Sequence, residues 1–199
     1  SYRAYPYAGE VKDNFDTRFH GILSHKIYNH LQDKVSIIIP IYNAYEETKE
    51  CIRSVLLNTH INYELILIND CSTDPRINVL LNYVEDIPFV RIIQNKQNQG
   101  FVKNINMGIK ASTGDVVLLN SDTIVTPRWL SQIVLSAYRD GRIATVTPIS
   151  NSSDIAVQEL GETNDLLYLD KNARQVNKLS KEEYIQSPTG NGFCLFIKR

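Results

Sequence analysis

Five short segments rich in β-branched and aliphatic residues recur along the chain at nearly constant intervals. They begin at Val35, Tyr63, Phe89, Asp115 and Arg142, so successive starts lie 28, 26, 26 and 27 residues apart. The stretches between them carry apolar residues at helical spacing. This rhythm predicts a series of strand–helix units.

The apolar runs are continuous rather than alternating, which decides the kind of sheet. Ile37–Ile39, Leu65–Ile68 and Val116–Leu119 contain no polar residue. Strands of this kind are typical of parallel sheets that are covered on both faces. We therefore expect an α/β fold, a mostly parallel sheet sandwiched between helices, with a further strand in Gly192–Ile197.

The predicted helices have recognisable starting signals. Asn43 with Glu46 three residues later fits a capping box. Asp74–Pro75 and Thr126–Pro127 each place a capping side chain before a first-turn proline. These signals predict helices that start at these three places.

The two remaining parts of the chain differ from this pattern. Residues 1–34 carry four tyrosines without a clear period, and we interpret them as a lead-in or linker. Residues 35–199 form the predicted domain. Within it, residues 151–188 are polar, and Ser180 with Glu183 predicts a short helix there. A polar stretch of this length in a compact domain is often functional.

Composition and charge narrow the classes of partner. The 199 residues include 21 Lys+Arg and 22 Asp+Glu, a net charge of −1, which argues against nucleic acid as the main partner. No apolar run approaches the roughly 18 residues that span a bilayer. The three cysteines are far apart, which favours neither a disulfide framework nor a zinc cluster and fits a reducing cytoplasm.

Polar residues follow four of the predicted strands directly. They lie in residues 40–43, 69–72, 95–100 and 120–123. Each segment alone is explained by ordinary turn chemistry. Because ligands of open α/β sheets bind beyond the carboxyl ends of the strands, the coincidence of four such segments favours a binding site. The glycine motifs of dinucleotide-binding and P-loop proteins are absent from the sequence.

The order of these segments resembles family 2 glycosyltransferases of the GT-A fold, with the rhamnosyltransferase-like branch nearest. The resemblance is carried by Val35–Asn43, Ile68–Asp74, Asn98–Phe101 with Asn106, and Gly114–Thr123. It implies a metal-assisted, inverting transfer of a sugar from a nucleotide diphosphate donor, UDP- or dTDP-linked, to a hydroxyl of a glycan or lipid-linked acceptor. Such an enzyme of polysaccharide biosynthesis would work in the cytoplasm, with membrane contact only through parts outside this chain.

The resemblance also implies roles for individual residues. Tyr42 belongs to the loop that lines base and ribose, and Asp70 to the position that accepts a hydrogen bond from the pyrimidine N–H. Gly100 permits close backbone approach where a helix start favours diphosphate. For Glu46 a capping box, and for Lys103 plain solvation, are the alternatives. The full set is Pro40, Tyr42, Asn43, Glu46, Asp70, Asn98, Gly100, Lys103, Asn106, Asn120 and Ser121.

Asp122 is the predicted metal ligand. It occupies the last position of the family's D-x-D element, whose carboxylate holds Mn²⁺ or Mg²⁺ together with donor phosphate oxygens. Here the element reads Asn120-Ser121-Asp122, so the first carboxylate is missing. The resemblance therefore implies donor binding more firmly than metal dependence.

The general base that inverting transfer needs has no candidate in the matched segments. In the family it follows the strand that resembles Gly192–Ile197, so we expect it beyond Arg199. Two explanations stay open: the chain lacks the C-terminal acceptor part, or it is a degenerate nucleotide-binding or scaffolding module. A sugar-nucleotide pyrophosphorylase ranks lower, because Pro40–Ala44 supplies no glycine-rich basic loop.

Overall fold

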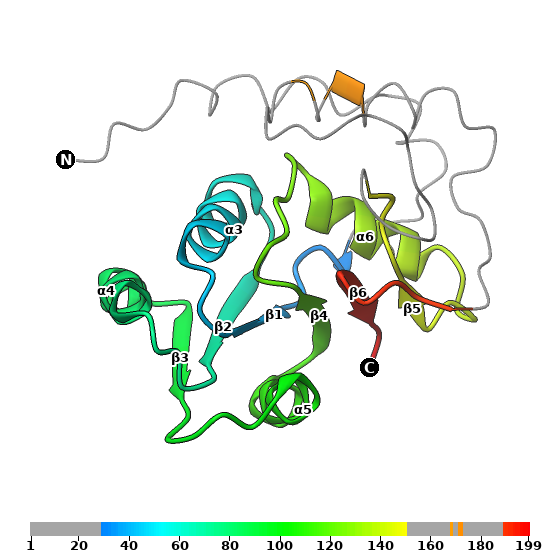
Figure 1. The fold of residues 1–199 in the computed structure, drawn as a ribbon. Helices are drawn as coiled ribbons and strands as arrows, with labels where there is room; N and C mark the ends of the chain where they lie inside the picture. Colours follow the sequence, from blue (N-terminus) through cyan, green and yellow to red (C-terminus); the bar gives the residue numbers. More distant parts are fainter. Residues whose placement is uncertain (1–28, 151–167, 169–170, 173–188) are drawn as a thin grey trace.

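A computed structural model describes residues 29–150, 168, 171–172 and 189–199 (Figure 1). In this part of the chain the strands are β1 (Val35–Ile41), β2 (Tyr63–Asn69), β3 (Val90–Gln94), β4 (Asp115–Leu119), β5 (Thr145–Val146) and β6 (Cys194–Ile197). The helices with regular bounds are α3 (Tyr45–Asn58), α4 (Pro75–Val84), α5 (Phe101–Ala111) and α6 (Trp129–Tyr138). The expected helix at Ser180 lies outside the described residues.

The strands form one sheet in the order β3-β2-β1-β4-β6-β5. β1 to β4 are parallel, while β6 runs antiparallel to both β4 and β5. The predicted mostly parallel α/β sheet is therefore confirmed. The strand expected from Arg142 is shorter, because the Asp140 carboxylate binds the backbone N–H and the guanidinium of Arg142 and makes a turn there.

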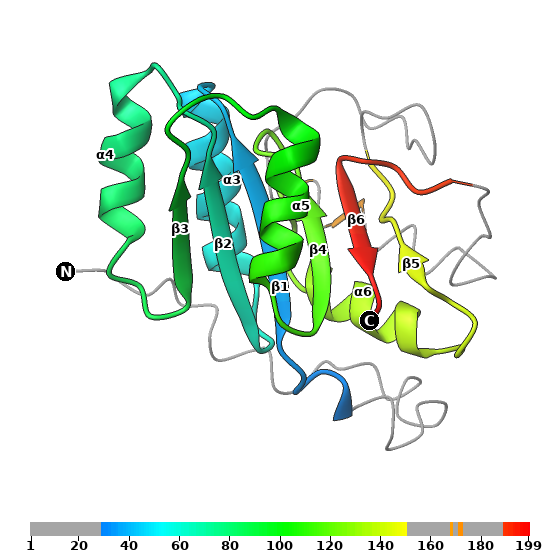
Figure 2. The ribbon, with the colours of Figure 1, turned by 90° about the horizontal axis from the view of Figure 1, so that it is seen from below.

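The continuous apolar runs divide between the two faces of the sheet. Ile37, Ile39 and Ile41 of β1 join the core that α3, α4 and α6 cover. Ile38 points the other way and packs with Ile105 of α5. Figure 1 shows α3 and α6 on one side of the sheet and α5 on the other, and Figure 2 shows α5 lying along the strands. The three-layer arrangement follows from strands that are apolar on both faces.

Helix α5 approaches the sheet closely at Gly108. A Cβ atom at this position would lie 2.5 Å from Cγ2 of Ile38 and 3.0 Å from Cδ1 of Ile68. Real side chains do not pack this tightly, so a glycine is needed for this distance between helix and sheet. The contact fixes the helix whose first turn reaches the carboxyl ends of the strands.

Buried polar groups of α3 hold the segment that follows β4. Ser54 Oγ accepts a hydrogen bond from the Val125 N–H at 3.1 Å, and Asn58 Nδ2 donates to the Val125 carbonyl at 2.8 Å. Trp129 Nε1 donates to Thr59 Oγ1 at 3.0 Å. These bonds connect residues about seventy positions apart and fix the path of the chain beyond the strand end.

Two of the three predicted helix starts have a proline in the first turn. The Asp74–Pro75 start is confirmed, because the Asp74 side chain accepts a hydrogen bond from the Arg76 N–H and Pro75 opens α4. The Thr126–Pro127 start is wrong by two residues. Helix α6 begins at Trp129 after Arg128 in a left-handed conformation with φ 66°, because the preceding residues are bonded to α3.

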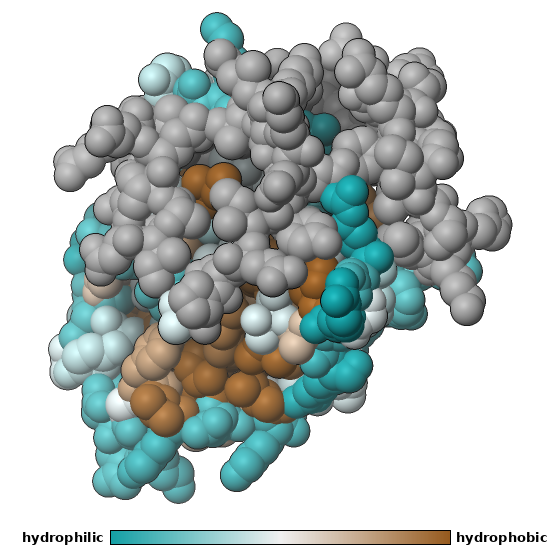
Figure 3. Space-filling view, turned by 90° about the vertical axis from the view of Figure 1, so that its right-hand side faces the viewer, coloured by the Kyte–Doolittle hydropathy of each residue, from teal (hydrophilic) through white to brown (hydrophobic). Residues whose placement is uncertain are grey.

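The surface beside β5 and β6 carries a continuous apolar area bordered by hydrophilic residues (Figure 3). Leu195 and Ile197 of β6 are half-buried, and Ile149 just after β5 is exposed. Among the described residues, no helix is long and apolar enough to cross a membrane.

Candidate functional site

A cleft of about 390 Å³ lies where the carboxyl ends of β1, β2 and β4 meet the start of α5. This is where parallel strands of an open α/β sheet present their loops. The lining residues are Pro40, Ile41, Tyr42, Asp70, Asn98, Gly100, Phe101, Asn104, Asn120, Ser121 and Asp122. Its volume falls in the range of small-molecule sites, which is roughly 300–1,000 Å³.

Most residues singled out from the sequence converge on this cleft. The lining includes Pro40, Tyr42, Asp70, Asn98, Gly100, Asn120, Ser121 and Asp122. Four do not line it: Asn43, Glu46, Lys103 and Asn106. Three lining residues were not singled out: Ile41, Phe101 and Asn104. Phe101 follows Gly100 directly, and Asn104 lies three residues after Phe101. Residues at this spacing share one face of a helix, so helical spacing from Gly100 is the sequence signal that points to both.

Asp70 is buried at the end of β2, with 3% of its surface exposed. Its Oδ1 accepts hydrogen bonds from the Gln99 N–H at 2.7 Å and Asn95 Nδ2 at 2.9 Å, and its Oδ2 accepts one from the Gly100 N–H at 2.9 Å. Burial alone would raise the pKa of Asp70, but these hydrogen bonds together hold the pKa below its ordinary value. Asp70 is therefore ionised at neutral pH and fastens the loop that leads into α5.

The hydrogen bonds to Asp70 make the start of α5 a poorer binding site for an anion. The N–H groups of Gln99 and Gly100 already bind a carboxylate, which places a negative charge at the positive end of the helix. Gly100 has φ 81°, which an L-residue rarely adopts, while a Cβ there would meet open space. Its glycine is thus required by the backbone conformation that presents the N–H to Asp70.

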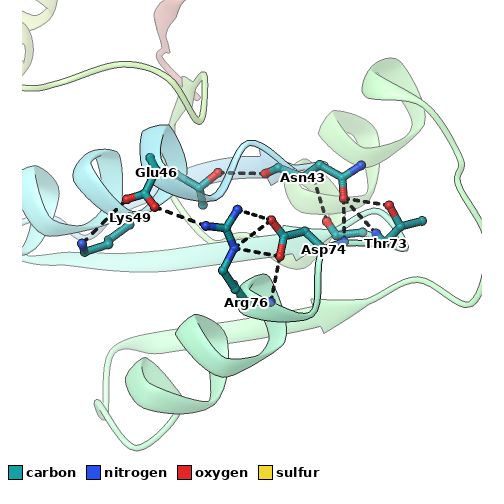
Figure 4. Close-up of polar contacts among 8 residues, drawn as sticks. Asn43, Glu46, Lys49, Thr73, Asp74 and Arg76 are labelled. Carbon is teal, nitrogen blue, oxygen red and sulfur yellow. Dashed lines mark hydrogen bonds and ion pairs between the residues drawn. The ribbon is translucent and has the colours of Figure 1, made fainter.

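Asn43 does not form the predicted capping box with Glu46. The N-cap of α3 is Ala44, which makes no side-chain capping bond. Both Asn43 and Ala44 are left-handed, with φ 57° and 49°, and this turns the Asn43 amide away from the helix start. Its Oδ1 instead accepts from the backbone N–H groups of Thr73 at 2.8 Å and Asp74 at 3.0 Å (Figure 4).

Glu46 likewise has a different partner from the one predicted. Its carboxylate lies 3.3 Å from Nη1 of Arg76 and 3.9 Å from Nζ of Lys49, and Arg76 also binds Asp74 (Figure 4). The Arg76 guanidinium lies 4.6 Å from the ring centre of Tyr45. Asn43 and Glu46 therefore join the start of α3 to the β2–α4 loop and to the first turn of α4.

The loop that carries Asp122 is fixed by hydrogen bonds to residues of α3 and of the segment before β6, which are far away in the sequence. The Asn120 N–H donates to the Phe193 carbonyl at 2.9 Å, just before β6. Cys51 Sγ of α3 donates to the Asn120 carbonyl at 3.4 Å. Burial raises the pKa of Cys51 to about 12, with a smaller contribution from the nearby charge of Asp122, so the thiol stays protonated and remains a donor.

The Asp122 side chain itself is exposed to the cleft. It accepts no hydrogen bond and forms no ion pair within the part of the chain that the structure describes. No group of three or more His, Cys, Asp or Glu side chains suited to a metal ion occurs among the described residues. The donors at hand are one carboxylate, the Asn120 amide and the Ser121 hydroxyl, hard oxygen atoms that suit Mn²⁺ or Mg²⁺ only with further ligands from a bound molecule.

Two aromatic side chains line the cleft from different elements. Tyr42 follows β1 and is 52% exposed, and Phe101 opens α5 and is 54% exposed. Large rings that remain this exposed inside a cleft offer faces on which a planar ligand can stack. The cleft thus combines aromatic surface, one fixed buried carboxylate and one unengaged carboxylate.

Comparison with known proteins decides the family. The profile of glycosyl transferase family 2 matches residues 36–197, which is most of the chain. The chain belongs to glycosyl transferase family 2. It is 32% identical over 132 residues to an uncharacterised glycosyltransferase, YibD of Escherichia coli, covering 66% of this chain and 37% of YibD. To an uncharacterised glycosyltransferase of Nostoc it is 32% identical over 165 residues, covering 81% of this chain and 48% of that protein.

The fold agrees with this assignment. The mannosyltransferase PcManGT of Pyrobaculum calidifontis, solved in complex with GDP-Man and Mn²⁺, has a TM-score of 0.58 and 15% identity, covering 87% of this chain and 50% of that chain. The fold is GT-A, and the family is one of enzymes, the glycosyltransferases. The chain spans between about a third and a half of the length of the curated relatives described above. The rhamnosyltransferase-like branch stays a prediction, since these relatives do not distinguish it.

Proposed function

We propose that this chain binds the nucleoside diphosphate of a sugar donor in the cleft and supports transfer of the sugar to an acceptor hydroxyl. The observation that carries the proposal is that Tyr42, Asp70, Gly100 and Asp122, scattered over eighty residues, line one cleft. A UDP- or dTDP-linked donor is favoured, because both bases present an N–H to an ionised acceptor such as Asp70.

Different residues of the cleft contact the base, the ribose and the diphosphate of the donor. The ring of Tyr42 faces the base or ribose, and the free lone pair of Asp70 Oδ2 accepts the base N–H. Asn98 and Asn120 offer amide groups to the ribose. Since Asp70 already places a negative charge at the start of α5 and leaves no room there for a cation, we place the diphosphate on the opposite side of the cleft, next to Asp122, where a bound cation would offset the charge of both.

Asp122 is the side chain that would hold Mn²⁺ or Mg²⁺, with oxygen atoms of the diphosphate completing the ligand set. When bound, the cation supplies Lewis-acid neutralisation of the charge that develops on the departing nucleoside diphosphate. One protein carboxylate is a weak site by itself, so the chain is expected to take up the metal only with the nucleotide. PcManGT was solved with both GDP-Man and Mn²⁺.

The acceptor side of the reaction is not supplied by these residues. Among the described residues that line the cleft, the carboxylates are Asp70 and Asp122, and both have other tasks. A general base for inverting transfer is therefore expected outside this set, and we keep the prediction that it follows Arg199. A glycan or lipid-linked acceptor, a role in polysaccharide biosynthesis and a cytoplasmic location belong to the same proposal.

A second candidate function follows from one specific feature. Asn120 stands where the D-x-D element has its first aspartate, which is the change expected in a module that keeps nucleotide binding and has lost transfer. The two functions differ in turnover. Release of UDP from a UDP-sugar, measured on the protein with the residues that follow Arg199 included, with a panel of acceptors and Mn²⁺, is expected for the enzyme and not for the scaffold.

Titration calorimetry tests the binding itself. Wild type is expected to bind UDP and dTDP, with affinity raised at least about tenfold by Mn²⁺, because Asp122 would hold the cation and the cation would neutralise the charge of the diphosphate. Asp122→Asn should bind at least as tightly as wild type without metal, because a charge that repels the diphosphate is removed, and should lose the increase with Mn²⁺. Asp86→Asn, an exposed carboxylate after α4, is the matched control and should behave as wild type. Failure of wild type to bind any nucleoside diphosphate would end the proposal.

A further inference from the structure

Three short hydrogen bonds reach the carboxylate of Asp70, and one of them comes from a side chain; the Asn104 side chain adds a weaker interaction. Two come from backbone N–H groups, those of Gln99 and Gly100. The third comes from Nδ2 of Asn95, which lies 2.9 Å from Asp70 Oδ1. Because a side chain can be replaced without altering the backbone, Asn95 is the place where the orientation of Asp70 can be tested.

Asn95 makes a second bond with the same amide group. Its Nδ2 also donates to Oδ1 of Asn104 at 2.6 Å, so both protons of the amide are used. Asn104 is 1% exposed, lies in the first turn of α5 and lines the cleft. The Asn95 backbone N–H donates to the Asn69 carbonyl at 2.9 Å, which anchors Asn95 to the end of β2. Asn95 thus bridges the strand end and the helix start.

The bridge limits which part of the Asp70 carboxylate is available to a ligand. Oδ1 accepts two hydrogen bonds and is saturated, whereas Oδ2 accepts one and keeps one lone pair. If Asn95 were absent, Oδ1 would regain a lone pair, and of these three donors only the backbone N–H groups of Gln99 and Gly100 would still hold the carboxylate, which could then tilt more easily. The ligand would then meet an open lone pair on each oxygen of a less firmly fixed carboxylate.

We propose that Asn95, which does not line the cleft, is a positioning residue for Asp70 and thereby sets the discrimination between nucleobases. The inference rests on the proposed function, in which Asp70 accepts a base N–H. Uracil presents N–H at ring position 3, whereas cytosine presents a bare nitrogen that would face the fixed lone pair of Asp70. A fixed acceptor rejects cytosine strongly, because two acceptors would then meet without a proton between them.

The test compares UDP with CDP in calorimetry without metal. Wild type is expected to bind UDP at least about tenfold more tightly than CDP, and Asn95→Ala is expected to reduce that ratio to about threefold or less. A purely structural role would weaken both nucleotides by the same factor and leave the ratio unchanged. Gln97→Ala, an exposed amide of the same loop that does not line the cleft, is the matched control and should keep the wild-type ratio.

If Asn95→Ala does not fold, Asn95→Ser carries the test. Its single hydroxyl proton can serve Asp70 or Asn104 but not both, so the ratio should still fall. Asp70→Asn, measured in the same way, distinguishes the role of Asp70 from the role of Asn95. No binding of UDP to wild type overturns the proposed function. A ratio that survives Asp70→Asn overturns the assigned role of Asp70, and a ratio lost in Asp70→Asn but kept in the Asn95 variants overturns this inference alone.

Discussion

Asp70 and Asp122 line the same cleft, yet the chain surrounds them in opposite ways. Asp70 is buried and accepts three hydrogen bonds from the loop before α5. Asp122 is exposed and accepts none from any residue that the structure describes. The difference separates two uses of a carboxylate, one that organises the site before a ligand arrives and one that is left available to a cation.

Each side of the cleft also depends on a different part of the fold. The Asp70 side is built locally, from β2, the loop after β3 and the first turn of α5. The Asp122 side is supported from afar, by Cys51 of α3 and the Phe193 carbonyl next to β6. Loss of Asp70 should therefore disturb the scaffold, whereas loss of Asp122 should disturb only binding.

The largest expected effect is that of Asp70→Ala on stability. The substitution leaves the N–H groups of Gln99 and Gly100 and the Asn95 amide without their acceptor. We expect the free energy of unfolding to fall by about 2–3 kcal/mol, measured by chemical denaturation. If the decrease were no larger than for substitution of an exposed surface carboxylate such as Asp86, other contacts would hold the loop. Asp70 and Asp122 would then not differ in their structural roles.

How far the sequence predicts this cleft depends on the kind of contact. Continuous apolar runs such as Ile37–Ile39 indicate a parallel sheet, and parallel strands bring their carboxyl ends together whatever the loops contain. For this reason the sequence predicts that Asp70 and Asp122, fifty-two positions apart, lie near each other. Regular topology is predictable because it follows from periodicity alone.

The direction of a single side chain is not predictable in the same way. Asn43 and Glu46 fit a capping box in sequence, but two successive left-handed residues redirect Asn43 to the β2–α4 loop. Whether the backbone enters that conformation depends on partners thirty residues away. Cys51 and Phe193 were missed because their contact with Asn120 depends on the tertiary fold and leaves no local motif.

A smaller effect is expected on the acid side of the stability profile. Hydrogen bonds hold the pKa of Asp70 in the folded chain below its unfolded value of about 3.9, so the folded state binds fewer protons there. The stabilisation is fully present above that unfolded pKa and is lost as pH falls through the lower folded pKa. The difference in melting temperature between wild type and Asp70→Asn should be constant above about pH 5 and narrow below about pH 4.

The acid profile has an internal control. Hydrogen bonds from Arg142 lower the pKa of Asp140 to about 2, but Asp140 is present in both proteins, so its titration cancels in the comparison. A difference between wild type and Asp70→Asn that stays constant down to about pH 2.5 would mean that Asp70 does not titrate with a lowered pKa. The carboxylate would then not be the ionised anchor that the hydrogen bonds indicate.

The smallest expected effect on the free protein is that of Asp122→Asn. Because the side chain is exposed and has no hydrogen-bond or ionic partner among the described residues, the free energy of unfolding should change by less than about 0.5 kcal/mol.

Thermal unfolding of wild type and Asp122→Asn with added ligands extends the measurement. Mn²⁺ alone should scarcely shift the wild-type melting temperature, since one carboxylate binds the cation weakly, whereas Mn²⁺ with UDP should raise it by more than UDP alone. In Asp122→Asn the additional increase should vanish. If Asp122→Asn instead destabilised the free chain as strongly as Asp70→Ala, Asp122 would be a structural residue, and the two sides of the cleft would not differ in the way argued here.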